Sequence, residues 1–368
     1  MVAPCVERLE LSIQTAGTDI ERAMLSAELG CYLARIGSSE SAEKIRLTLR
    51  QEFGDGRDGR VTIMLMLLEG LIVFFRDLGE ESLDRVRRAL FLSHAMGFID
   101  LKALTAAWLS HIQFNRNSLK HAAESVHVAI ESVSANESAA LCRASLVLGD
   151  MFGFAARMDA ARRWYGLARN LAVEYGDQAS IGALTYNRAA LHVHALRLVE
   201  LEGLIEGRDL DFADAEVRSA INYQRLSGTT SLDHLLESAR TGLLMLKGQF
   251  TEARYEIEVL LNSGAIPENY YFAATLHADL ILCFAKAGNL NGAAAAIEKL
   301  ANFDQNHIPL DDKLLILHAL HRCEIDVHRI GWELVDRQAL LQLHKESAAR
   351  LVASIADLEN IPDRLKAH

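Results

Sequence analysis

The residue types best suited to chemistry in this sequence are histidines and acids on one stretch near the C-terminus. His318, His321 and His328 are spaced three and seven residues apart, so on a helix they share one face. His321, Glu324 and His328 could supply two or three ligands of the kind that bind zinc. A structural zinc site takes four ligands, and the HExxH spacing of zinc hydrolases is absent. We therefore interpret the stripe as a solvated or partner-facing helix surface, with metal binding as the weaker alternative.

Motifs of the common enzyme classes do not occur. The chain has no GxxxxGK[ST] phosphate loop, no GxGxxG after a predicted strand and no GxSxG nucleophile elbow. Its acidic pairs, Glu80-Glu81 and Asp311-Asp312, fall at predicted helix starts, where carboxylates interact favourably with the helix dipole. We interpret the chain as a non-enzyme without a cofactor.

Charge and hydropathy narrow the classes of partner. The sequence carries 38 basic and 49 acidic residues, a formal net charge of -11. Nucleic-acid affinity comes largely from neutralising phosphates with a basic face, so we expect no DNA or RNA partner. The most apolar segment, 61–75, is shorter than the roughly 20 residues that span a bilayer, so we expect a buried helix and no membrane contact.

The cysteines and the N-terminus point to the cytoplasm. Five cysteines are scattered along the chain without CxxC spacing, which is typical of reduced, mostly buried thiols. The first ten residues lack the basic and apolar stretches of a signal peptide. We therefore expect a cytoplasmic protein.

The elements that must position any site are helices. Only four prolines interrupt a chain rich in Ala and Leu, and the alternation typical of strands is missing. We expect helix pairs at about 20–53, 61–96, 100–134, 138–175, 180–226, 232–262 and 270–303, then single helices at about 311–330 and 333–358.

An internal repeat of about 40 residues organises these helices. In the segment 143–172, Leu148-Gly149 and Phe152 fall on one predicted helix, and Ala161, Tyr165 and Ala168 fall on the next. Small residues let two antiparallel helices approach closely while the tyrosine fills the space between them. We expect the turn within each pair at residues suited to positive φ or loops: Gly37, Gly79, Asn117, Ala156, Gly248 and Gly288.

A second set of breaks separates successive pairs. The sequences EFGD, AMGF and EYGD end at Asp55, Phe98 and Asp177, and each follows an amphipathic helix. Glycine suits the position after a helix end, and aspartate can cap the helix that follows.

This pattern resembles the tetratricopeptide repeat, in the longer variant found in bacterial regulators. The resemblance covers about residues 20–305 and implies an all-α fold, an α-α superhelix of antiparallel helix pairs. We expect the repeat array at 1–310, with a possible break near 227–231, and C-terminal capping or dimerisation helices at 311–368.

Stacked helix pairs present a concave face lined by the first helix of each pair. An aromatic anchor and a few polar groups on that face would bind a peptide or a helix of a partner protein. The alternative is that these side chains belong to the inner-face packing. The candidate residues are Trp108, His111, Asn115, Arg143, Asp150, Tyr186, Asn187 and His194.

The last predicted helix carries an apolar stripe at 341–358 with heptad-like spacing. This stripe is too short to indicate a coiled coil, so capping of the array and homodimerisation stay open as alternatives.

Three functions follow from the resemblance and the candidate face. The first is a protein- or peptide-binding scaffold in bacterial signalling. The others are a small-molecule-sensing regulator, and a sensor module acting with a separate output domain such as a diguanylate cyclase.

Overall fold

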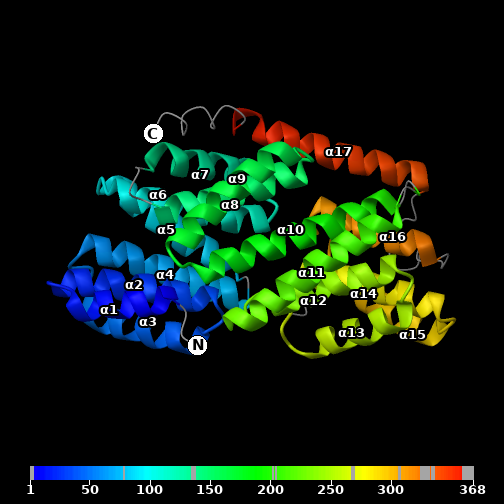
Figure 1. Ribbon diagram of the computed structural model, residues 1–368, viewed down its shortest axis with the longest axis horizontal. Helices are drawn as coiled ribbons and strands as arrows, with labels where there is room; N and C mark the ends of the chain where they lie inside the picture. Colours follow the sequence, from blue (N-terminus) through cyan, green and yellow to red (C-terminus); the bar gives the residue numbers. More distant parts are fainter. Residues whose placement is uncertain are drawn as a thin grey trace. The chain divides into compact units, whose positions relative to one another are not determined.

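Helices make up the fold of the described part of this chain, as the computed structural model shows (Figure 1). It describes residues 4–77, 79–133, 138–200, 203, 205–266, 270–305, 308–323, 332 and 336–358, and within these ranges it contains no strand. The predicted all-α fold is confirmed.

Successive helices pair along the chain much as the repeat predicts. The largest packing interfaces join α6 with α7, α8 with α9 and α4 with α5. The helices are α1 (Pro4–Thr15), α2 (Asp19–Arg35), α3 (Ser39–Phe53), α4 (Gly59–Asp77), α5 (Glu80–Ala95), α6 (Ile99–Asn115), α7 (Leu119–Ser132), α8 (Ser138–Phe154), α9 (Met158–Glu174), α10 (Gln178–Val199), α11 (Gly207–Ser227), α12 (Asp233–Leu246), α13 (Phe250–Asn262), α14 (Tyr271–Lys286), α15 (Leu290–Leu300), α16 (Leu310–Cys323), α17 (Arg337–Ile355) and the 3-10 helix η4 (Ala356–Leu358).

The protein forms two compact units that are discontinuous in sequence. Unit 1 comprises residues 1–184, 224–231 and 351–368, and unit 2 comprises 185–223 and 232–350. These units follow spatial contacts, and the predicted boundary at residue 310 stays a prediction.

The predicted turns within pairs are left-handed at five of six positions. Gly37, Asn117, Ala156, Gly248 and Gly288 have φ of 88°, 54°, 57°, 74° and 69°. The sixth, Gly79, has φ -56° and caps the N-terminus of α5. At this turn the backbone therefore enters the second helix of the pair without a left-handed residue at the predicted position.

The predicted aspartate cap of the helix that follows a break is observed at one break and not at another. Asp177 caps α10, since its Oδ1 accepts the Ser180 backbone N–H at 3.0 Å. At the first break the predicted cap, Asp55, is wrong: Asp58 accepts the Val61 N–H at 2.9 Å instead. The loop before α4 places Asp58, and not Asp55, next to the first turn of that helix.

The predicted close packing of α8 on α9 is confirmed at Gly149. A methyl group added there would overlap the ring of Tyr165, so only glycine fits this approach. The Tyr165 hydroxyl donates to Asp150 Oδ1 at 2.6 Å, which fixes the ring across the interface. Ala161 and Ala168 are fully buried beside it.

We expect Gly149→Ala to destabilise the protein by about 1–3 kcal/mol, because Tyr165 must move out of a close-packed interface. The matched control is Gly166→Ala on the exposed side of α9, where an added methyl meets nothing within 4 Å. That control should stabilise the protein by about 0.5–1 kcal/mol through helix propensity. Urea unfolding of both variants measures the difference, and shifts of equal sign would contradict the packing account.

Helix α4, which contains the most apolar segment, is buried within unit 1. Its side chains at Ile63, Leu67, Leu68 and Leu71 are almost fully inaccessible. This confirms the predicted buried helix. No helix in the described ranges is long and apolar enough to cross a membrane. All five cysteines are buried and free of disulfides.

Unit 2 contains a buried ionic cluster between α10, α14 and α16. Arg197 donates to both carboxylate oxygens of Asp279, at 2.5 and 3.1 Å, and both side chains are more than nine-tenths buried. Arg322 pairs with Glu200 at 2.8 Å, and His318 Nε2 lies 3.7 Å from the same carboxylate. Burial and the neighbouring arginines lower the pKa of His318 to about 3.

The lowered pKa of His318 predicts that the folded protein loses stability as the pH falls. Between the ordinary pKa of about 6.5 and the folded value of about 3, the unfolded protein binds a proton at His318 that the folded protein does not. The free energy of unfolding should therefore fall by about 1.4 kcal/mol for each pH unit below 6.5. Urea unfolding at pH 7.0, 6.0 and 5.0 tests this. His318→Gln should reduce the slope, and an unchanged slope would contradict the assignment.

The predicted apolar stripe of the last helix is largely buried within the protein itself. Leu351, Ile355 and Leu358 are at most 2% exposed. Capping of the array and homodimerisation both stay predictions. Of the weak metal candidates, His321 lies at the end of α16, whereas Glu324 and His328 fall outside the described residues.

Candidate functional site

A pocket of about 370 Å³, open to solvent, lies within unit 1. The first helices of four successive pairs line it, namely α2, α4, α6 and α8, together with α1 and the corner between α9 and α10. Its lining residues include two of the predicted site residues, Trp108 and Arg143. The helices that the repeat predicts as ligand-facing therefore do surround a cavity here.

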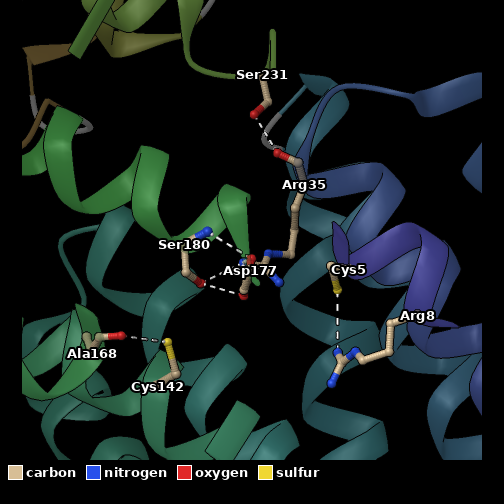
Figure 2. Close-up of polar contacts among 8 residues, drawn as sticks. All are labelled: Cys5, Arg8, Arg35, Cys142, Ala168, Asp177, Ser180 and Ser231. Carbon is tan, nitrogen blue, oxygen red and sulfur yellow. Dashed lines mark hydrogen bonds and ion pairs between the residues drawn. The ribbon is translucent and has the colours of Figure 1, made fainter. Parts of the chain in front are cut away.

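One side of the pocket is built around Arg35 at the end of α2 (Figure 2). Its Nη2 donates to both oxygens of Asp177, at 2.9 and 2.8 Å, and to Ser180 Oγ at 2.7 Å. Burial opposes the charge of Arg35, yet the Asp177 carboxylate raises its pKa above the ordinary value. The Ser231 hydroxyl donates to the Arg35 carbonyl oxygen at 2.5 Å. Asp177 and Ser180 therefore hold the Arg35 side chain in place at one side of the pocket.

Arg143 is the second arginine of the pocket and lacks such a partner. It is 5% exposed, and its guanidinium carbon lies 3.9 Å from the centroid of the Trp108 ring. Its Nε is buried without a hydrogen-bond partner in the described structure. Burial, followed by repulsion from Arg35, lowers the pKa of Arg143. The site therefore holds a cation whose environment disfavours its charge.

The Trp108 ring lies against the guanidinium groups of both arginines. The guanidinium carbon of Arg35 lies 5.6 Å from the Trp108 centroid, so both cations contact the same indole. Such contacts stabilise a cation by about 0.5–2 kcal/mol, which offsets only part of the cost of burying two like charges. Asp177 supplies one counter-charge for the two arginines.

Helix α1 completes the pocket and is not among the predicted helices. It contributes Cys5, Arg8 and Leu9 to the lining. The Arg8 guanidinium carbon lies 5.1 Å from the Tyr175 centroid at the far corner. The apolar spacing Cys5, Val6, Leu9 and Ile13, which forms a small core cluster, is the signal that could have identified this helix.

Three other predicted residues of unit 1 serve packing around the site. His111 lies between the rings of Phe74 and Trp108, with centroids 5.4 and 5.7 Å away, and burial lowers its pKa well below the ordinary value. Asn115 donates to the His111 carbonyl at 2.9 Å. Asp150 accepts the hydroxyl of Tyr165 inside its own repeat. None of the three lines the pocket.

The remaining predicted residues, Tyr186, Asn187 and His194, lie on α10 in unit 2. Tyr186 is partly buried and packs against the core cluster around Ala189 and Val193. The structure thus brings Trp108 and Arg143 together at one pocket and assigns these three to the other unit.

The pocket offers no activated nucleophile or metal centre among the described residues. Burial raises the pKa of Cys31 to about 12 and also raises those of Cys5 and Cys142, so these three thiols stay protonated at neutral pH. The described residues include no group of three or more His, Cys, Asp or Glu side chains that could hold a metal ion. The arrangement is suited to binding an anion.

No protein-family model matches this sequence, and no curated protein matches it either. Among solved structures it is similar to a Rap protein complexed with the competence and sporulation factor. The match has a TM-score of 0.51 and 15% sequence identity, and covers 94% of this chain and 99% of the Rap chain. At this identity the likeness shows the fold, which confirms the predicted tetratricopeptide-like arrangement of helix pairs.

Proposed function

We propose that this tetratricopeptide-like repeat protein is a non-catalytic regulator that binds a peptide or a segment of a partner protein in the pocket of unit 1. The observation that carries the proposal is the pocket itself, lined by the first helices of four successive pairs. An aromatic side chain with a charged neighbour in a partly desolvated hollow is typical of binding hot spots. Trp108 and Arg143 have this arrangement.

The structural neighbour supports a binding role. The Rap protein was solved in complex with the competence and sporulation factor, so a protein of this fold holds a ligand. We propose a role in bacterial signalling in the cytoplasm. A sensor module acting with a separate output domain, such as a diguanylate cyclase, stays an alternative. A homodimer through the C-terminal helix stays part of the proposal.

A small-molecule-sensing regulator is the second candidate. The pocket volume of about 370 Å³ favours it, because pockets for small ligands span roughly 300–1,000 Å³. A ligand of that size could occupy the hollow between α1 and α8 entirely.

Capture of partners from native lysate tests the first candidate. The full-length protein is compared with a Trp108→Ala, Arg143→Glu double variant that has been checked for folding by circular dichroism. The matched control is Phe91→Ala, Arg88→Glu on the exposed face of α5, where both side chains are at least 70% exposed. A partner lost only from the pocket variant supports the proposal.

A partner retained by the pocket variant and lost from the control would place the interface outside the pocket and contradict the proposal. If no protein is captured but the purified protein retains a small molecule detectable by mass spectrometry, the second candidate replaces the first.

A further inference from the structure

The charged side chains that line the pocket do not all pair with one another. The pocket is lined by three arginines and three acids: Arg8, Arg35, Arg143, Glu28, Asp100 and Asp177. Asp177 is paired with Arg35, and Asp100 is paired with Arg60, which lies outside the lining.

Arg8 and Glu28 have solvent-exposed surface and attract each other. Arg143 is only 5% exposed, and its buried Nε has no hydrogen-bond partner within the described ranges. The carboxylates of Asp177 and Asp150 attract Arg143, but burial and repulsion from Arg35 outweigh them and lower its pKa. A buried guanidinium whose charge is only partly compensated is costly, and a bound anion would reduce that cost.

The stacking of Arg143 on Trp108 determines which geometry of anion can bind to it. Its N–H groups lie in the guanidinium plane, so contact of one face with the indole leaves them available to acceptors in that plane. A carboxylate matches this fork with two parallel hydrogen bonds. The nearby Arg35 strengthens the attraction because it repels Arg143 and favours a negative charge between them.

The surroundings favour a single negative charge attached to an apolar group. Asp177 already lies in this site, so a dianionic phosphate would bring more negative charge than Arg143 can compensate. Apolar side chains line much of the rest of the pocket, with Leu25, Leu67 and Leu104 among them. Burial of an apolar group against these side chains adds binding free energy.

We propose that the pocket of unit 1 is a carboxylate-binding site, in which Arg143 on Trp108 receives a monoanionic carboxylate and the leucine-rich wall receives the apolar group next to it. The inference rests on the proposed binding function of this pocket. The carboxylate belongs to the C-terminal residue of a peptide or to a small carboxylic acid.

Isothermal titration calorimetry on the full-length protein tests the ligand class. The probes are hexanoate, hexanamide and inorganic phosphate, followed by N-acetyl-Gly-Leu as the free acid and as the C-terminal amide. We expect each acid to bind at least about tenfold more tightly than its amide, as charge-assisted hydrogen bonds require. Tighter binding of the peptide acid than of hexanoate identifies a peptide carboxylate, and the reverse identifies a small acid.

Substitutions at Arg143 test whether this residue binds the carboxylate. Arg143→Gln should weaken hexanoate at least about tenfold, and Arg143→Lys should weaken it less, since the charge remains without the fork. The matched control is Arg254→Gln in unit 2, where an arginine with an unpartnered Nε also stacks on an aromatic ring, that of Phe284. Hexanoate affinity should be unchanged in this control.

Three results would overturn the carboxylate site. These are equal binding of hexanoate and hexanamide, tighter binding of phosphate than of hexanoate, and unchanged hexanoate binding in Arg143→Gln. If acid and amide bind equally and Trp108→Ala abolishes both, the pocket keeps its binding function and only the ligand class is wrong. If no probe binds at millimolar concentration, the result would count against the carboxylate site and against the proposed binding function of the pocket.

Discussion

Replacement of Asp177 by alanine is expected to destabilise the protein by about 3–5 kcal/mol, measured by urea unfolding, because removal of one partner leaves a buried charge uncompensated. Asp177 is the counter-charge of Arg35. The same carboxylate caps α10 through the Ser180 N–H, and loss of a cap alone costs about 1 kcal/mol. Two unneutralised guanidiniums would then contact one indole, that of Trp108.

Two further variants separate these contributions. Asp159→Ala removes an exposed partner of Arg162 at the start of α9, and should cost less than about 1 kcal/mol. Arg35→Met combined with Asp177→Ala removes both charges and should recover more than half of the loss. If Asp177→Ala costs no more than Asp159→Ala, the ion pair does not hold this corner of the pocket together.

The repeat architecture could be predicted because its signals are local. A turn at Gly37 or Asn117 depends on the conformation of one residue, and the approach at Gly149 depends on a small residue opposite a tyrosine one helix later. These requirements recur about every 40 residues and are visible without knowledge of the fold. The helix boundaries therefore agree with the prediction to within a few residues across most of the described ranges.

The pocket could be predicted only in part, because its electrostatics are non-local. Arg143 and Trp108 could be selected by their expected position on first helices. The partner of Arg35 lies 142 residues away, and no spacing rule connects them. Helix α1 closes one side of the pocket, although it carries none of the repeat's glycine signals. Asp150 shows the converse: its position is ligand-facing by pattern, yet its carboxylate accepts a hydrogen bond from Tyr165.

The largest gain in stability is expected from a substitution at Arg143. Replacement by methionine should stabilise the unliganded protein by about 1–3 kcal/mol, because a buried cation disfavoured by burial and by Arg35 gives way to an apolar side chain of similar length. The thioether can still pack on the Trp108 ring, so little of the dispersion contact is lost. Urea unfolding of the ligand-free protein measures the change.

The sign of this change separates a binding role for Arg143 from a structural one. A structural arginine would lose stability on replacement, as we expect for Arg197→Met in unit 2, which leaves Asp279 buried without its partner. A residue retained for a ligand makes the free protein less stable than it could be, which is typical of functional sites. Arg143→Met should therefore gain stability and lose hexanoate binding together. Loss of stability in Arg143→Met would make the arginine part of the framework and remove the main support for an anion site.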